Sequence, residues 1–298
     1  MPNIVNAKKS GVITIVGKPN VGKSTLLNTI CKKKVSIVSY KPQTTRNQIK
    51  TLFSNEMLDI TFVDTPGFHF AKNKLDLFLN SEIKKTFKSC DLVLFLVDPT
   101  RPVDDEDLEI IKFVKSYKLE KIILVITKCD VVTEGSIRNH INSISKHFTP
   151  IATTKISSKN NSFELLFEAI YENLIGYQQL EETQDSDNFN IAEIIREQIL
   201  LNCKKEVPYA TGIYIEKTSF DESKNIFNIF ANIFVEKSSQ KPILIGKNGT
   251  MIKKIGVNAR KELLKIYDCK INLKLFVKVQ TDWRNNPKVL SLLGYSNK

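Results

Sequence analysis

Residues 17–24 read Gly17-Lys18-Pro19-Asn20-Val21-Gly22-Lys23-Ser24, and they match the pattern G-x-x-x-x-G-K-[ST] at every fixed position. An apolar run at residues 12–16 precedes this stretch, and a segment of helical periodicity follows it. In such a strand–loop–helix unit, the glycines let backbone N–H groups surround a phosphate, and the helix N-terminus adds positive dipole there. The stretch therefore predicts a phosphate-binding loop, and we expect all eight residues to line a nucleotide site.

Two side chains of this loop carry specific chemistry. We expect the Lys23 ammonium to reach the β- and γ-phosphates and the Ser24 hydroxyl to ligate Mg²⁺. The alternative is a glycine loop that only joins a strand to a helix. The full match in its strand–helix context argues against that alternative.

Short apolar runs alternate with amphipathic segments over the first 176 residues. The predicted strands are residues 12–16, 58–63, 92–97, 122–127 and 151–157, and the predicted helices lie near residues 24–32, 75–89, 105–117, 136–147 and 163–175. Apolar strands that alternate with helices are typical of a parallel sheet covered on both faces. We predict a doubly wound, mostly parallel α/β sheet that binds its ligand at the carboxyl ends of the strands.

Two further motifs are expected to close around the phosphates. Asp64-Thr65-Pro66-Gly67 follows a predicted strand, so that Asp64 would hold the Mg²⁺ through a water and the Gly67 N–H would contact the γ-phosphate. Pro42-Gln43-Thr44-Thr45-Arg46 lies between the two motifs. A Thr hydroxyl there would complete the Mg²⁺ shell only while the γ-phosphate is present, and we favour Thr45 over Thr44 as this ligand.

A third motif points to the base. Thr127-Lys128-Cys129-Asp130 ends a predicted strand. In guanine-nucleotide proteins a carboxylate at the Asp130 position accepts hydrogen bonds from N1–H and the 2-amino group, and adenine lacks that donor pair. The usual first residue is Asn, and Thr127 cannot make every contact of an amide. Ser157-Ser158-Lys159 matches the loop whose backbone N–H meets the guanine carbonyl.

These elements, in this order, resemble a TRAFAC-class GTPase over residues 11 to about 176. The resemblance implies that the chain binds GTP and GDP with Mg²⁺ and that a partner accelerates slow hydrolysis. Phe68 stands where many small GTPases have a Gln that orients the attacking water. Backbone, a bound ion or a partner must then place that water. Asn20 could help to ligate a K⁺ in this role, whereas His69 is more often a surface residue than a base.

The polar, acidic segment 177–190 interrupts the alternation, and we predict a linker there. It would join a GTPase domain, residues 1–176, to a second domain, residues 191–298. We expect in the second domain a helix at 191–201, strands around 211–217 and 225–236, a basic helix at 250–267 and a last strand from residue 271 to 279.

The positive charge is concentrated in this second domain. The 298 residues carry a net charge of +12, and from Lys237 onward 14 Lys and Arg stand against 3 Asp and Glu, a balance of +11. Such a concentration favours a polyanionic partner for the C-terminal part.

The sequence Ile245-Gly246-Lys247-Asn248-Gly249 opens the predicted basic helix. A GxxG turn between two helices lets a nucleic-acid backbone pass close to the loop, while Lys247, Lys253 and Lys254 attract phosphates and an apolar groove accepts unpaired bases. In its basic, apolar-flanked setting the turn resembles that of a KH domain of type II. Lys274, Lys278 and Arg284 either extend the phosphate track or form a solvated strand face. We expect Trp283 to pack under the C-terminus rather than stack on a base.

With GKPNVGKS, PQTTR, DTPGF and IGKNGTMIKKIGVNAR, the whole chain resembles the Era family. The resemblance implies a GTPase of ribosome assembly whose KH domain binds the single-stranded 3′ end of small-subunit ribosomal RNA on the 30S subunit. It also implies a loose association with the inner face of the cytoplasmic membrane.

The five scattered Cys and the absence of a membrane-length apolar run lead us to expect a cytoplasmic protein, and we expect a monomer. Two alternatives stay open. The GTPase could serve another membrane-surface or tRNA-linked client, or the chain could be an RNA-binding protein with little turnover.

Overall fold

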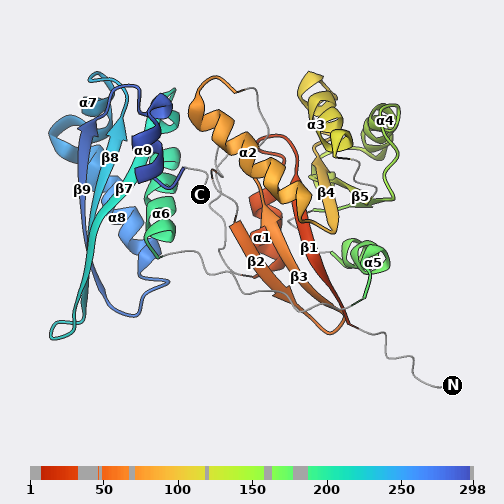
Figure 1. Cartoon of the computed structure of the whole chain (residues 1–298), viewed down its shortest axis with the longest axis horizontal. Helices are drawn as coiled ribbons and strands as arrows, with labels where there is room; N and C mark the ends of the chain where they lie inside the picture. Colours follow the sequence, from red (N-terminus) through yellow and green to blue (C-terminus); the bar gives the residue numbers. More distant parts are fainter. Residues whose placement is uncertain are drawn as a thin grey trace. The chain divides into compact units, whose positions relative to one another are not determined.

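The computed structural model describes residues 8–32, 46, 49–66, 71–117, 121–157, 163–176 and 187–295. It divides into two compact units (Figure 1). Unit 1 comprises Met1–Phe70 and Leu79–Thr183, and unit 2 comprises Ala71–Phe78 and Gln184–Lys298. No helix of the described part is long and apolar enough to span a membrane.

Unit 1 contains a six-stranded sheet. Its strands are β1 (Lys9–Val16), β2 (Ile49–Ser54), β3 (Leu58–Asp64), β4 (Leu92–Val97), β5 (Ile122–Ile126) and β6 (Ala152–Lys155). They are arranged in the order β2-β3-β1-β4-β5-β6, and every neighbouring pair is parallel except β2 with β3. The predicted mostly parallel sheet is therefore confirmed. The prediction missed only β2, an antiparallel edge strand whose Leu52 is exposed and which lacks a continuous apolar run.

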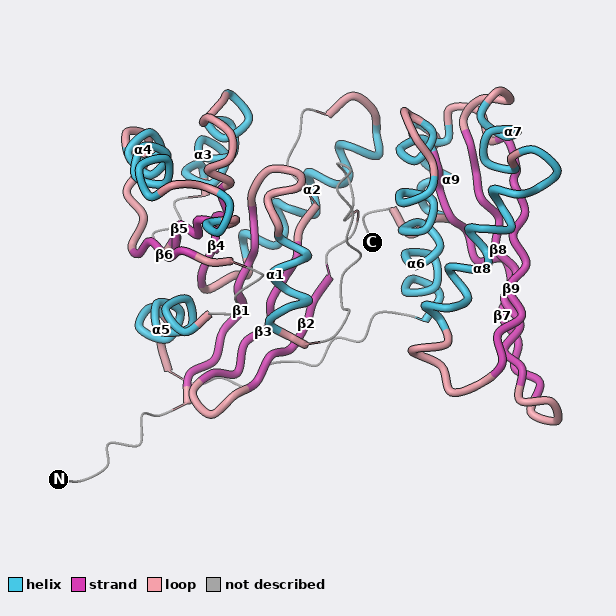
Figure 2. The backbone as a smooth tube through the Cα atoms, turned by 180° about the vertical axis from the view of Figure 1, so that it is seen from behind, coloured by secondary structure: helices cyan, strands magenta, loops and turns pink. Residues whose placement is uncertain are grey.

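Helices cover both faces of this sheet (Figures 1 and 2). They are α1 (Lys23–Ile30), α2 (Lys74–Lys88), α3 (Asp105–Ser116), α4 (Glu134–Ser145) and α5 (Glu164–Asn173). One apolar cluster joins the sheet to α1 and α5, and a second joins it to α2, α3 and α4. All six residues of β4 are buried because alternate side chains enter the two clusters. The carboxyl ends of β1, β3 and β5 carry the motifs of the predicted nucleotide site.

Unit 2 has the order α–β–β–α–α–β that the type II prediction requires. Its elements are α6 (Asp187–Asn202), β7 (Thr211–Asp221), β8 (Ile226–Val235), α7 (Gln240–Ile245), α8 (Thr250–Leu263), β9 (Lys270–Val279) and α9 (Pro287–Leu292). The sheet order is β7-β8-β9, with β7 and β8 antiparallel and β8 and β9 parallel. Helices α6 and α8 pack together on one side of this sheet (Figure 2).

Among the boundaries that differ from the sequence prediction are those of two helices in unit 2. The helix α6 begins at Asp187, so residues 187–190 belong to a helix rather than to the linker. Asp187, Asn188 and Asn190 are polar, so apolar periodicity alone places the start of this helix at Ile191. The rest of the predicted linker, residues 177–186, lies outside the described residues. The basic helix α8 ends at Leu263 and is four residues shorter than predicted.

Trp283 is completely buried, and its indole Nε1 donates a hydrogen bond to the Ala210 carbonyl at 2.9 Å. A Cβ built at Gly212, on β7, would lie 3.3 Å from the indole, so this ring packs against the sheet. The expectation that Trp283 has a packing role is confirmed.

Candidate functional site

The phosphate-binding loop lies between the end of β1 and the start of α1, where the sequence predicts it. Gly17 has φ 151°, and a Cβ at this position would lie 2.5 Å from the Leu96 carbonyl oxygen, so the loop can turn this closely past β4 only with glycine. Asn20 has φ 66° and is exposed at the tip of the loop.

The Lys23 side chain is buried under this loop. Its ammonium donates hydrogen bonds to the Gly17 and Lys18 carbonyls, each at 2.9 Å. Burial lowers the pKa of Lys23 to about 8, although the nearby Asp64 carboxylate opposes the shift. The loop therefore wraps around its own cation, and phosphates entering it would meet a charge that is already held in position.

Ser24 and Asp64 meet at the carboxyl ends of β1 and β3. The Ser24 hydroxyl donates to Asp64 Oδ2 at 2.7 Å, and Asp64 is fully buried. Thr65 donates its hydroxyl to the Ile15 carbonyl at 2.8 Å, which fixes the turn after β3 against β1. The structure thus brings together two of the three predicted Mg²⁺ ligands. Thr45, Gly67 and Phe68 lie outside the described residues, and Pro66 is the last described residue of that motif.

The base-recognition motif follows β5. Asp130 is exposed and accepts a hydrogen bond from the Ser157 hydroxyl at 3.0 Å, so the two predicted base loops meet. The Thr127 hydroxyl lies 2.9 Å from the Val21 carbonyl and 3.0 Å from the Val97 carbonyl. This threonine therefore connects the base loop to the phosphate loop despite its short side chain. Ser158 and Lys159 lie outside the described residues.

Three carboxylates that the sequence prediction missed, the buried Asp98 and Asp107 and the exposed Asp104, hold two of the predicted site lysines. Lys18, only 4% exposed, directs its ammonium to Asp104 at 2.9 Å and Asp107 at 2.8 Å, while Asp98 accepts from Lys128 at 2.5 Å. Burial opposes the charge on Lys18, but hydrogen bonds to Asp107 and Asp104 prevail and raise its pKa. The ammonium of Lys18 thus faces α3, so its part in nucleotide binding falls to its backbone.

A sequence signal for these carboxylates exists. Asp98 follows a buried strand, and Asp104 is the N-cap of α3, where it forms a capping box with Asp107. His140 on α4 is buried close to this group, and burial lowers its pKa. The polar side of the nucleotide site is therefore a network of paired charges rather than a set of isolated cations.

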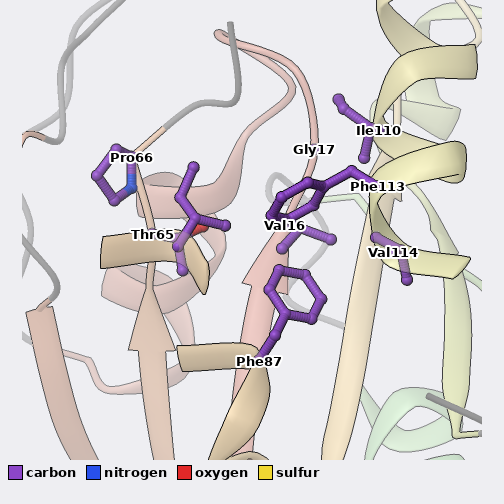
Figure 3. A pocket seen from close by; sticks show the side chains of 9 residues that line it. Val16, Gly17, Thr65, Pro66, Phe87, Ile110, Phe113 and Val114 are labelled. Atoms are coloured by element: carbon purple, nitrogen blue, oxygen red, sulfur yellow. The ribbon is translucent and has the colours of Figure 1, made fainter. Parts of the chain in front are cut away.

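An apolar hollow lies beside the phosphate loop (Figure 3). Val16, Gly17, Thr65 and Pro66 form one part of its lining, and side chains of α2 and α3 form the rest. The rings of Phe87 and Phe113 meet edge to face there, with centroids 5.4 Å apart. This hollow offers few polar groups to a ligand, so we assign it to helix packing and not to nucleotide binding.

In unit 2, the GxxG turn separates α7 from α8. Gly246 has φ 75°, and a Cβ there would lie 2.7 Å from the Met251 nitrogen, so a side chain would push the two helices apart. Asn248 and Gly249 also have positive φ, and Thr250 donates its hydroxyl to the Lys247 carbonyl at 2.9 Å. The turn is therefore sharp and closed on itself.

The side chains around the turn match the predicted nucleic-acid site in their exposure. Lys247 and Asn248 are exposed at the tip, Lys253 and Lys254 are exposed on the first turns of α8, and Ile245 is half-buried beside them. Arg284, in contrast, binds Glu236 in a charge pair, so it does not extend a track of available cations.

Comparisons with known proteins cover both units of the chain. Residues 12–128 match the family described as 50S ribosome-binding GTPase, and residues 206–284 match the KH domain. The chain is 43% identical over 297 residues to GTPase Era of Ureaplasma parvum serovar 3, covering 98% of this chain and 99% of that protein. It is 41% identical over 292 residues to GTPase Era of Clostridium acetobutylicum, covering 96% and 98%.

Two solved structures of Era proteins are similar along the whole chain. Era of Aquifex aeolicus bound to GDP and AlF4⁻ has a TM-score of 0.90 and 33% identity, covering 97% of this chain and 100% of that one. A structure of Era with MgGDPNP and nucleotides 1506–1542 of 16S ribosomal RNA has a TM-score of 0.91 and 34% identity, with the same coverage. The chain therefore belongs to the Era family, GTPases that carry a KH domain.

Proposed function

We propose that this protein hydrolyses GTP and binds the single-stranded 3′ end of small-subunit ribosomal RNA, and that it thereby couples nucleotide turnover to maturation of the 30S subunit. The observation that carries the proposal is the presence in one chain of a complete phosphate loop and a GxxG turn. A relative of 34% identity, similar over 97% of this chain, has been solved in complex with MgGDPNP and nucleotides 1506–1542 of 16S ribosomal RNA.

The nucleotide would lie at the carboxyl edge of the unit 1 sheet. Backbone N–H groups of residues 17–24 and the Lys23 ammonium would hold the phosphates, and Asp130 would select guanine. Thr127 supports this arrangement because its hydroxyl contacts a carbonyl of the phosphate loop.

The donor set of Ser24 and Asp64 suits Mg²⁺, since hydroxyl and carboxylate oxygens are the ligands it prefers and the two oxygens lie 2.7 Å apart. Thr45 would join them in the GTP state. When bound, Mg²⁺ would neutralise negative charge on the phosphates. We assign Lys23, Thr45 and the Gly67 N–H to positioning the γ-phosphate during the reaction.

Phe68 has no group that can orient the attacking water, so a different element must do this. Asn20 is exposed at the tip of the phosphate loop, where its side chain amide could bind a K⁺ near the transferred phosphate. Hydrolysis should then be faster in K⁺ than in Na⁺ buffer, and equal rates in the two would exclude this role for Asn20.

RNA binding is assigned to the GxxG turn and the first turns of α8. Lys247, Lys253 and Lys254 would contact phosphates, while Gly246 and Gly249 would let the RNA backbone pass close to the loop. We further propose a monomeric, cytoplasmic protein in which the basic KH domain permits a loose association with the inner face of the cytoplasmic membrane.

The test is a multiple-turnover GTPase assay with and without RNA that spans the 3′ end of 16S ribosomal RNA. We expect the RNA to raise the turnover rate. Turnover that is indifferent to the RNA would favour another client, such as a tRNA-linked or membrane-surface partner. Absence of turnover in both reactions would make the chain an RNA-binding protein whose nucleotide unit only binds.

A further inference from the structure

The outer face of the β7-β8-β9 sheet, opposite α6 and α8, carries aromatic rings and lysines. Along β9 the side chains alternate, so that Ile271 and Val277 are buried in the core while Lys274, Phe276 and Lys278 are exposed on the other face. The Phe276 ring is 45% exposed. Phe276 is thus an exposed aromatic residue that stands between two exposed lysines on the outer face of the sheet.

The neighbouring strand extends this surface. Phe230 on β8 lies opposite Lys274 in the register, and the Lys274 ammonium lies 5.3 Å from the centre of its ring. Two register pairs away, on the same face, Asn272 donates its side chain amide to the Asn228 side chain oxygen at 2.8 Å. The outer face therefore combines rings, amides and cations, the groups that stack on bases, bind base edges and contact phosphates.

Charge favours a polyanion here over an acidic or neutral protein surface. The outer side of β9 carries, in order, Lys270, Asn272, Lys274, Phe276 and Lys278, so that lysines alternate with the Asn and the Phe. Within the described residues, Glu216 is the acidic side chain that approaches them, 3.8 Å from Lys278. Side chains two residues apart on a strand are separated by about 6.6 Å, so Lys274 and Lys278 flank the Phe276 ring on both sides.

The surface continues from the GxxG site. Helices α7 and α8, which flank the GxxG turn, both contact β9, and β9 is the edge strand of the sheet. A strand of RNA that leaves the turn across this edge would arrive at Phe276. A GxxG loop clamps about four nucleotides, whereas the RNA in the complex of the relative spans nucleotides 1506–1542.

We propose that Phe276, Lys274 and Lys278 form a second RNA-binding surface, on which one base stacks while the flanking lysines contact its phosphates. The inference rests on the proposed RNA binding by the GxxG turn and extends the binding site around the sheet edge. The ligand is single-stranded RNA that continues beyond the nucleotides held by the GxxG turn.

The test uses the full chain, fluorescence anisotropy and nested fragments of RNA 1506–1542, down to the shortest fragment that still binds. Phe276→Ala should weaken binding of the longest RNA by about 5- to 100-fold, the usual effect of removing one stacking ring. The same variant should bind the shortest fragment like the wild type. Phe276→Trp should retain the affinity for the long RNA.

Phe220→Ala is the matched control, because Phe220 is an exposed ring, 53% exposed, on β7 of the same sheet but away from β9. It should leave both affinities unchanged. Unaltered Trp283 emission and basal GTP turnover would establish that the variants are folded.

The outcomes separate this inference from the proposed function. If no fragment binds the wild type, RNA binding itself fails. If Lys247→Asp/Asn248→Asp abolishes binding while Phe276→Ala binds every fragment normally, only the second surface is refuted. If Phe276→Ala reduces binding to intact small subunits but not to free RNA, the proposal is also overturned, and the surface belongs to a protein contact.

Discussion

The lysines of the two predicted sites are held in opposite ways in the two units. In unit 1, Lys18 and Lys23 are 4% and 7% exposed, and oxygen atoms of the protein surround each ammonium. In unit 2, Lys247, Lys253 and Lys254 are exposed, and within the described residues no carboxylate pairs with them. A buried, paired charge acts through fixed geometry, whereas an exposed charge acts through a field that salt screens.

The largest expected effect follows from removing the buried cation under the phosphate loop. Lys23→Ala should weaken GTP binding by about 10²- to 10⁴-fold. The variant would lose the charge-assisted hydrogen bonds from the Lys23 ammonium to the β- and γ-phosphates, and each such bond is worth about 1.5–3 kcal/mol. Titration with a fluorescent GTP analogue measures the loss. Lys84→Ala, an exposed lysine on α2, is the control and should bind normally. RNA binding should survive Lys23→Ala, and its loss would contradict the division of labour between the units.

The next effect is on stability. Lys18→Met leaves Asp107 buried without its cation, which costs about 2–4 kcal/mol in the free energy of unfolding of unit 1, since breaking a buried pair is expensive. Lys85→Met removes an exposed pair with Glu82 and should cost less than about 1 kcal/mol. Urea unfolding followed by circular dichroism compares the two variants. Equal urea midpoints for the two variants would show that the buried ion pair stabilises unit 1 no more than the exposed pair does.

In unit 2 the effect should be smaller and should depend on salt. Lys247→Asp/Asn248→Asp should reduce RNA affinity about 10- to 100-fold in low salt, because it removes one phosphate contact and adds repulsion. Loss of one contact should also lower the slope of log K against log salt by about 0.7. Lys265→Asp is the control, since Lys265 lies just beyond the C-terminal end of α8 and already pairs with Glu262. An unchanged slope would argue against phosphate contacts at the turn.

The smallest effect is a pH dependence that only the buried site should show. The pKa of Lys23 is lowered to about 8, so by pH 9 most of the protein has lost this proton and GTP binding should be about tenfold weaker than at pH 7. Between pH 8 and about 10.4 the folded protein has lost the Lys23 proton, whereas the unfolded chain still holds it. Raising the pH in this range therefore favours the folded state, and the free energy of unfolding should rise. Lys23→Arg does not titrate there and should lose both trends.

The position of the predicted nucleotide-site residues in the fold could be predicted because these residues belong to short local motifs. The loop at residues 17–24, Asp64 and Asp130 each lie at a strand end that apolar periodicity predicts. Ligands of such sheets bind at the carboxyl ends of the parallel strands. This rule predicts that the three motifs lie at the same edge of the sheet.

The sequence could not predict which carboxylates pair with which lysines. Asp104 and Asp107 meet Lys18 across 86 and 89 residues, and nothing in a local pattern encodes such a contact. For the same reason the pairing of Arg284 with Glu236, over 48 residues, removed one of three candidate phosphate contacts. The strand β2 was missed because an edge strand is specified by its neighbour and not by its own apolar run.

The buried Trp283 gives the protein an internal fluorescence probe. It is the only tryptophan in the chain, and its indole is held by the Ala210 carbonyl inside unit 2. Its emission should therefore move to longer wavelength only when unit 2 unfolds, while unfolding of the nucleotide unit leaves it unchanged. Tryptophan emission and far-ultraviolet circular dichroism, recorded on one sample, would separate the melting of the two units without any label.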